Sequence, residues 1–290
     1  MSLRGSIYKL IMNIAGKSSH GIEIAQTYGL NSAEMMEYIY RRVPTPVGKN
    51  ILGYWADSIF LNFPTWKSLR QRKQNLQHIL YYIIKGRLER EPEKEIKILD
   101  LASGYSQYIF TVLNKLGDKA SKVYVEMRDK NIVCGEHINN ANKNKYNVKY
   151  VKADILKEED YDLSNTFDII ILAGFFDSLG MGEANKIEHT MNLVKKIMNI
   201  GALFIFSYQA LHVDTALVNE LFNDTYGVPL SMGERTGIDI KFLMKETGFN
   251  NIGQIQDSDG CYPVVISAQT DTVIDYIDKI LAMDNKQQLK

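Results

Sequence analysis

The pattern of apolar residues changes along the chain near residue 90. Before that point apolar residues recur every three or four positions, which is typical of helices, and we expect the segment that starts at Trp66 to form a helix ending at Gly86. After residue 95 short apolar runs alternate with helical segments. Such alternation predicts an α/β fold with a mostly parallel sheet and crossover helices.

The runs expected to form the five parallel strands are residues 96–102, 123–127, 148–151, 167–172 and 203–206. Two further runs, residues 252–255 and 264–267, lie close together, with Gly260 and Pro263 between them. We expect this pair to form an antiparallel hairpin at the end of the sheet. A plain dinucleotide-binding fold would instead continue with further parallel strands.

The segment before the sheet indicates a helical extension. Asn31 is a plausible helix N-cap, because Glu34 follows three residues later as in a capping box. The charged stretch 87–95 separates the part of the chain with helical periodicity from the part in which short apolar runs alternate with helical segments. We therefore predict two units: a helical N-terminal extension or cap over residues 1–90, and a ligand-binding α/β domain over residues 91–290.

Composition narrows the classes of function. The chain has 290 residues with 34 basic and 34 acidic side chains, so its total charge does not favour nucleic acid or an anionic membrane. The two cysteines and five histidines lack metal-binding spacing, and we predict no metal. Neither a convincing signal peptide nor a membrane-spanning run is recognisable, so we expect a cytoplasmic protein.

The segment 98–106 holds the first candidate site. An apolar strand ends in Asp100 and is followed by small residues at alternate positions, namely Ala102, Gly104 and Ser106. Small residues let the backbone turn tightly and let a ligand approach the main chain at the open end of a parallel sheet. Taken alone, the same pattern also describes a strand-to-helix turn without any ligand.

Acids at the ends of the next two strands strengthen the case for a ligand. Asp129 could accept hydrogen bonds from two ribose hydroxyls, with Glu126 as the competitor if the strand ends earlier. Asp154 could accept from an adenine amine, with Ala153 or Ile155 in contact with the ring. The alternative for each acid is an N-cap on the following helix.

Together, the strand, turn and acids resemble the class I S-adenosylmethionine-dependent methyltransferases, whose Rossmann-like sheet is mostly parallel with an antiparallel last strand. Ala102 and Ser106 stand where that family usually carries glycine. The resemblance implies S-adenosyl-L-methionine as cofactor and S-adenosyl-L-homocysteine as product, with Asp100 near the methionine end. The cofactor-binding residues expected on this basis are Asp100, Ala102, Ser103, Gly104, Tyr105, Asp129, Asp154, Ile155, Ala173 and Gly174.

More narrowly, the chain resembles a family of bacterial proteins assigned as methyltransferases and sometimes fused to an α/β-hydrolase. The likeness covers residues 30–269 and rests on segments 57–73 and 204–212, on Tyr105 and Tyr108 of the turn, and on Asp129 with the arginine before it. This resemblance is more informative about the fold and the cofactor than about the substrate.

Methyl transfer from a sulfonium needs alignment more than a universal catalytic residue. If the acceptor must lose a proton, the candidates for a general base follow the fourth and fifth strands: Asp177, Tyr208 and His212. A lone histidine is more often structural than catalytic. Arg70 and Lys73 could meet a substrate anion, although a solvated helix face explains them as well.

The leading expectation is a methyltransferase for a small-molecule or lipid-like acceptor, because the charge is balanced and a helical cap suits an enclosed acceptor. The alternatives are a catalytically silent cofactor-binding protein, a methyltransferase acting on RNA or protein, and a nicotinamide-dependent oxidoreductase. A homodimer formed through the N-terminal helices is a further expectation.

Overall fold

The computed structural model describes residues 18–46, 51–179, 181–210 and 237–269. Its α-helices are α2 (His20–Tyr28), α3 (Ala33–Arg41), α4 (Ile51–Leu61), α5 (Pro64–Arg90), α6 (Gln107–Leu116), α7 (Ile132–Asn142), α8 (Ala184–Lys196) and α10 (Gly237–Thr247). Its strands are β1 (Ile96–Leu101), β2 (Val123–Asp129), β3 (Val148–Lys152), β4 (Phe167–Leu172), β5 (Met198–Ser207), β6 (Asn250–Ile255) and β7 (Val264–Ala268). Short 3-10 helices are η2 (Gly117–Lys122), η3 (Glu158–Asp160), η4 (Phe176–Ser178) and η5 (Met181–Glu183).

The strands form one sheet in the order β3-β2-β1-β4-β5-β7-β6. β1 to β5 are parallel where they pair, whereas β7 runs antiparallel to both of its neighbours, β5 and β6. The predicted terminal hairpin and the mostly parallel sheet are therefore confirmed. Parallel strands place their carboxyl ends along one edge, where α/β proteins bind ligands.

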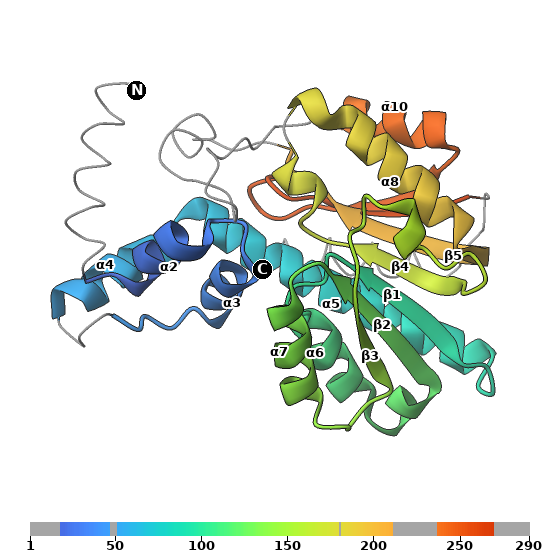
Figure 1. Cartoon of the computed structure of the whole chain (residues 1–290), viewed down its shortest axis with the longest axis horizontal. Helices are drawn as coiled ribbons and strands as arrows, with labels where there is room; N and C mark the ends of the chain where they lie inside the picture. Colours follow the sequence, from blue (N-terminus) through green and yellow to red (C-terminus); the bar gives the residue numbers. More distant parts are fainter. Residues whose placement is uncertain (1–17, 47–50, 180, 211–236, 270–290) are drawn as a thin grey trace.

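Both faces of the sheet are covered, as near-continuous apolar strands require. Successive residues of a strand point to opposite faces, so Ile98 of β1 joins a core cluster with α5 and α6, while Leu99 joins another with α8 and α10. Figure 1 shows these helices in layers on either side of the strands. The two buried layers fix the sheet edge that carries the candidate site.

Helix α5 continues past the point at which the sequence suggests a stop. It runs through Gly86 to Arg90, so the prediction of an end at Gly86 is wrong. Glycine inside a helix costs about 1 kcal/mol, but Leu88 beyond it is buried in the sheet core, which returns about 1.5–3 kcal/mol. Arg87 Nη1 also donates to the backbone oxygen of Asp168, 3.1 Å away. Tertiary packing thus outweighs the local signal.

The N-terminal helices α2, α3 and α4 pack around their own apolar cluster, which includes Trp66 and Leu69 from the start of α5. The cap of α3 is Ser32, whose Oγ accepts from the backbone N–H of Met35, so the assignment of Asn31 as the N-cap is wrong by one residue. α5 belongs both to this cluster and to the sheet core. A division of the chain into units at residue 90 stays a prediction.

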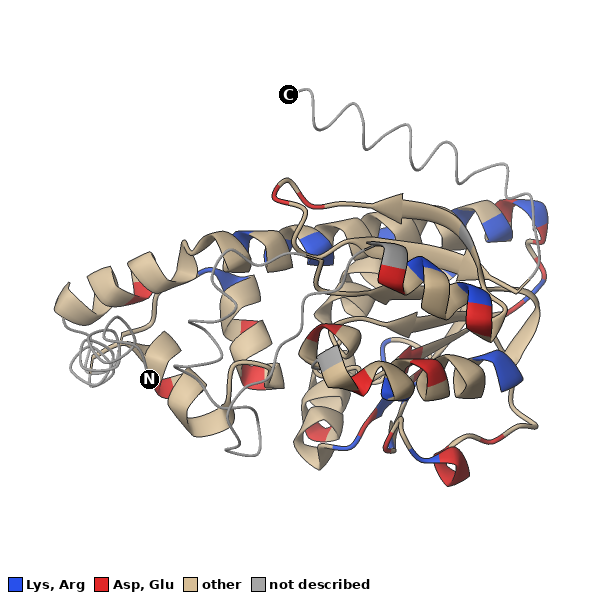
Figure 2. Ribbon diagram, turned by 90° about the horizontal axis from the view of Figure 1, so that it is seen from above, with Lys and Arg blue, Asp and Glu red and all other residues tan. Residues whose placement is uncertain are grey.

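Figure 2 shows more charged residues around the sheet than at the end of the molecule formed by the N-terminal helices. Within the described ranges, no helix combines the length and apolar character needed to cross a bilayer.

Candidate functional site

The turn after β1 has an unusual backbone. Ala102, Gly104 and Ser106 have φ angles of 48°, 52° and 49°, so every second residue is left-handed. Glycine adopts this conformation freely, whereas a residue with a Cβ pays roughly 1–2 kcal/mol for it. The turn is therefore strained at Ala102 and Ser106, and it lies at the carboxyl end of β1, on the edge of the sheet where α/β proteins bind ligands.

Asp129, at the end of β2, holds this turn in place. Its Oδ2 accepts a hydrogen bond from the backbone N–H of Gly104 at 2.9 Å, and its Oδ1 accepts from the backbone N–H of Asn131 at 2.9 Å. The competitor Glu126 is buried and accepts from the Arg128 guanidinium at 2.6 Å. Asp129 thus lies beside the turn, and Glu126 is already neutralised elsewhere.

Asp100 is a buried acid without a cationic partner. Its carboxylate accepts from the Ser106 hydroxyl and, at 2.5 Å, from the Tyr108 hydroxyl. Burial raises its pKa to about 7, while these two hydrogen bonds act in the opposite direction and the nearby Asp129 raises it further. Within the described part of the chain, no ion pair involves Asp100. Asp100 is thus a buried carboxyl group held by two hydroxyls directly before the turn.

The third acid, Asp154, lies just beyond β3 in a tight loop. Its Oδ1 accepts from the backbone N–H of Leu156 at 3.1 Å, and its own N–H donates to Asp160 Oδ2 at 2.6 Å. The side chain of the neighbouring Ile155 is buried. Asp154 thus caps a local turn and not a helix, because the N-cap of the next helix, η3, is Lys157; the alternative of an N-cap on the following helix is wrong for Asp154.

Helix α3 covers the turn from outside the sheet. The Tyr105 hydroxyl donates to Glu34 Oε1 at 3.1 Å, and the Tyr105 ring stacks on His137 with centroids 3.9 Å apart. His137 belongs to α7, and its Nε2 lies 3.5 Å from Oε2 of Glu37, a second glutamate of α3. The turn thus has the sheet edge on one side and a helix carrying two glutamates on the other.

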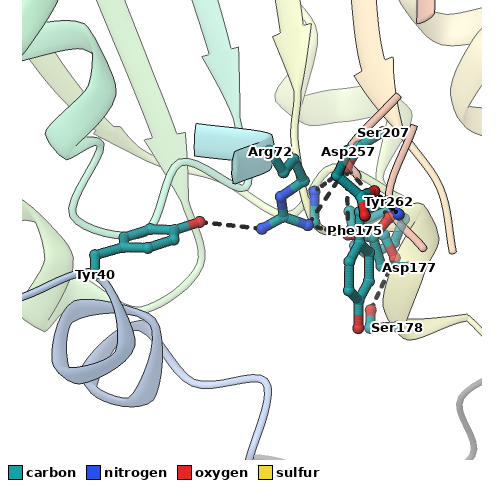
Figure 3. A network of polar contacts seen from close by, with 9 residues as sticks. Tyr40, Arg72, Phe175, Asp177, Ser178, Ser207, Asp257 and Tyr262 are labelled. Atoms are coloured by element: carbon teal, nitrogen blue, oxygen red, sulfur yellow. Dashed lines mark hydrogen bonds and ion pairs between the residues drawn. The ribbon is translucent and has the colours of Figure 1, made fainter. Parts of the chain in front are cut away.

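A second polar cluster joins the ends of β4 and β5 to the N-terminal helices (Figure 3). Arg72 of α5 forms an ion pair with Asp177, and the two side chains are only 4% and 7% exposed. Arg72 Nη2 donates to the Tyr40 hydroxyl at 3.1 Å. Ser207 Oγ accepts from the backbone N–H of Gly174 at 3.1 Å and lies 3.2 Å from both Asp177 oxygens. These bonds connect helices α3 and α5 with the loop after β4 and with the end of β5.

The remaining predicted cofactor residues lie at the same sheet edge. Ser103 is buried, and its backbone N–H donates to the carbonyl of Arg128 at 3.0 Å. Ala173 and Gly174 directly follow β4, and Gly174 has a φ of 98°. A Cβ built at Gly174 would come within 3.5 Å of the Arg72 guanidinium. The structure thus brings the turn, the strand-end acids and the β4 loop to one edge.

The three predicted catalytic residues differ in their surroundings. Asp177 is committed to Arg72 and Ser207; burial raises its pKa, and the contact with Arg72 lowers it. Tyr208 is buried in the core on the α8 and α10 side, and burial raises its pKa as well. His212 lies outside the described residues.

Arg72 and Tyr40 are the polar residues that sequence reasoning missed. A usable signal existed for Arg72, because it falls on the buried stripe between Leu69 and Leu76 of α5. The two cations chosen instead are not on a solvated face: Arg70 Nη1 donates to the carbonyl of Leu61, and Lys73 Nζ donates to Gln107 Oε1. The distance from Arg70 Nη1 to the Leu61 oxygen is 3.0 Å, and the distance from Lys73 Nζ to Gln107 Oε1 is 2.7 Å.

Across the described segments, no group of three or more histidine, cysteine or acidic side chains is arranged to hold a metal ion.

Comparison with solved structures identifies the fold. A Bordetella parapertussis protein described as a "possible exported protein" superposes with a TM-score of 0.62 at 13% identity, covering 89% of this chain and 86% of that one. The CurJ carbon methyltransferase matches with a TM-score of 0.50 at 16% identity, covering 66% of this chain and 53% of that one. The sheet is the Rossmann-like methyltransferase sheet expected from the sequence.

Among curated proteins, the Escherichia coli (strain K12) protein YnbC, itself described as uncharacterized, is 22% identical over 265 residues. The alignment covers 90% of this chain but only 44% of YnbC, so the chain spans less than half the length of that relative.

A family model described as "Putative methyltransferase" matches residues 2–269. Since this match spans nearly the whole chain, the protein belongs to that methyltransferase family.

Proposed function

We propose that this protein transfers a methyl group from S-adenosyl-L-methionine to a small-molecule or lipid-like acceptor. The observation that carries the proposal is the strained small-residue turn 102–106, with the buried, unpaired Asp100 beneath it and Asp129 beside it. When bound, the cofactor supplies an electrophilic methyl group on a sulfonium.

The residues at the turn fit this cofactor in charge. S-adenosyl-L-methionine carries a sulfonium and an ammonium, and Asp100 offers a buried carboxyl group whose partners among the described residues are two hydroxyls. A dinucleotide fits less well, because the Gly104 N–H that would meet a pyrophosphate already donates to Asp129. A carboxylate in that place repels phosphate oxygens.

Further residues would hold the rest of the cofactor. Asp129 would accept hydrogen bonds from the ribose hydroxyls. Asp154 would accept from the adenine amine through the oxygen that its capping bond leaves free, and Ile155 would contact the ring. The main chain from Ser103 to Tyr105 and from Ala173 to Gly174 would line the methionine side.

The chain's own part in the chemistry is alignment and exclusion of water. α3 covers the turn through Glu34, and Arg72 ties α5 to the β4 loop through Asp177. We infer that Asp177 serves mainly to hold Arg72, because taking up a proton would give up a buried ion pair. A base for the acceptor, where one is needed, is then better sought in His212.

Isothermal titration of the full chain with S-adenosyl-L-methionine, S-adenosyl-L-homocysteine and NAD tests this proposal. We expect the first two ligands to bind and NAD not to bind. Asp129→Asn should weaken binding, because its amide nitrogen cannot accept from a ribose hydroxyl. Asp118→Asn, on the exposed η2 segment, is the matched control and should bind as the wild type does.

The same titration separates the main alternative. The strain at Ala102 and Ser106 is the specific observation in favour of a catalytically silent protein, since the methyltransferases that the turn resembles usually carry glycine at these positions. Binding of neither cofactor form, or binding of NAD alone, would overturn the proposal. Cofactor binding without turnover across a broad acceptor screen would favour the silent protein.

A further inference from the structure

Helix α4 turns an apolar face toward solvent. Among the most exposed large apolar side chains of the described residues are Ile51 at 77%, Leu52 at 78%, Tyr54 at 53%, Trp55 at 63%, Ile59 at 63% and Phe63 at 47%. Ile51, Trp55 and Ile59 recur at every fourth residue of α4 and so form one ridge, and Phe63 follows just after the helix ends. Figure 1 places α4 at the end of the molecule away from the strands. We call these six side chains the α4 face.

The opposite side of α4 is firmly held. Asp57 is buried, and its Oδ1 accepts from the Ser19 hydroxyl at 2.6 Å and from the Gly21 backbone N–H at 3.0 Å. Phe60 is also buried, and its ring packs on Trp66 with centroids 5.5 Å apart. The opposite side of α4 is therefore anchored by a buried, hydrogen-bonded acid and by an aromatic contact.

The size of the α4 face is that of half a protein interface. Large apolar side chains carry roughly 150–250 Å² each, so six of them at these exposures offer on the order of 700 Å². The largest apolar patch of a typical monomer is roughly 300–600 Å². Two such faces together would bury on the order of 1,400 Å², within the roughly 1,200–2,000 Å² of a stable complex.

The charges around the face favour one occupant. Asp57 is the single charged residue of α4, and it is buried on the far side. A face without charge can meet its own copy without like-charge repulsion, which an isologous interface requires. Helices that lie on membranes characteristically carry lysine and arginine on their polar side, and α4 has neither.

We propose that the α4 face is the docking surface for a second copy of this chain, in a two-fold dimer. A ridge with a spacing of four residues packs into the matching groove of its copy at an angle of about −50°. Trp55 lies within the ridge and has the size and type of side chain that anchors interfaces. Figure 1 shows α4 and the strands at opposite ends of the chain, so a second copy seated on the α4 face would lie away from the sheet.

Sedimentation velocity of the full chain over a range of micromolar concentrations tests the proposal. We expect a concentration-dependent dimer for the wild type. Ile59→Glu should raise the dimer dissociation constant at least about thirtyfold, because the interface would bury an unpaired charge. Phe242→Glu on α10 is the matched control, since its side chain is 61% exposed against 63% for Ile59, and it should dimerise as the wild type does.

A second variant, Trp55→Ser, keeps the test decisive if a charge at residue 59 disturbs the fold, and thermal unfolding of each variant shows whether the monomer is intact. A wild-type protein that stays monomeric throughout the range would overturn the proposal. So would dimerisation that both α4 variants leave unchanged. Monomers that bind phosphatidylcholine vesicles through Trp55 would assign the face to a lipid surface instead.

Discussion

Two buried acids at the same edge of the sheet have opposite surroundings. Asp100 at the end of β1 accepts from the hydroxyls of Ser106 and Tyr108, whereas Asp177 beyond β4 is paired with the Arg72 guanidinium. Both carboxyl groups are buried. The comparison indicates two different roles: the acid beside β1 can change its protonation near neutral pH, whereas the acid beyond β4 is neutralised by its own arginine.

The largest expected effect comes from breaking the neutralised pair. Arg72→Met leaves Asp177 as a buried, unpaired charge, and such a change costs about 3–5 kcal/mol of unfolding free energy. The double variant Arg72→Met with Asp177→Asn removes both charges and should recover most of that loss. Urea denaturation of both variants measures these differences.

Arg41→Met is the control for this prediction, because Arg41 pairs with Glu37 while its side chain is 65% exposed. We expect it to cost less than about 1 kcal/mol. Equal losses for the two arginine variants, or no recovery in the double variant, would refute a special role for the buried pair.

The next effect concerns the pH dependence of stability at Asp100. Its folded-state pKa of about 7, raised by burial, lies above the ordinary value of 3.8. The folded state therefore holds the proton more tightly than the unfolded state, so this group loses stability as pH rises from about 4 to about 7. In that window, the unfolding free energy of Asp100→Asn should rise relative to that of the wild type by up to about 1.4 kcal/mol per pH unit.

Denaturant unfolding of the wild type and of Asp100→Asn from pH 5 to pH 8 measures this difference directly. If the difference in unfolding free energy between the two proteins does not increase with pH, Asp100 titrates at its ordinary pKa.

The smallest effect concerns backbone strain in the turn. Ala102→Gly removes a left-handed alanine and should stabilise the fold by about 0.5–1 kcal/mol. Ser106→Gly relieves the same strain but deletes a hydroxyl that donates to Asp100, so it should not stabilise. Thermal unfolding distinguishes the pair, and an equal gain in both variants would show that the Ser106 bond contributes nothing.

The sheet was predictable from sequence because its signals are local. Apolar runs mark each strand, and the small residues between Asp100 and Ser106 mark the turn within a few positions of one another. The prediction at Gly86 is wrong because the packing of Leu88 on the sheet depends on contacts distant in sequence. The prediction at Asn31 is wrong for a local reason: asparagine and serine are both favoured N-cap residues, so residue type does not distinguish Asn31 from Ser32.

The sequence indicates Asp177 as a candidate residue on the β4 side, but it does not indicate that Asp177 pairs with Arg72. Arg72 and Asp177 are 105 positions apart in sequence, and only the sheet topology brings them together. The left-handed conformation of Ala102 and Ser106 is likewise invisible in residue type, since both are small residues that suit many turns. The acceptor remains a proposal because no local pattern encodes its shape.

The most direct measurement is the number of protons released when S-adenosyl-L-methionine binds at pH 7, obtained by titration calorimetry in buffers of different ionisation enthalpy. A cation beside Asp100 favours its ionised form, so we predict proton release by the wild type and a smaller release by Asp100→Asn. Absence of binding, or the same proton release in both proteins, would contradict a cofactor site built around the unpaired acid of β1.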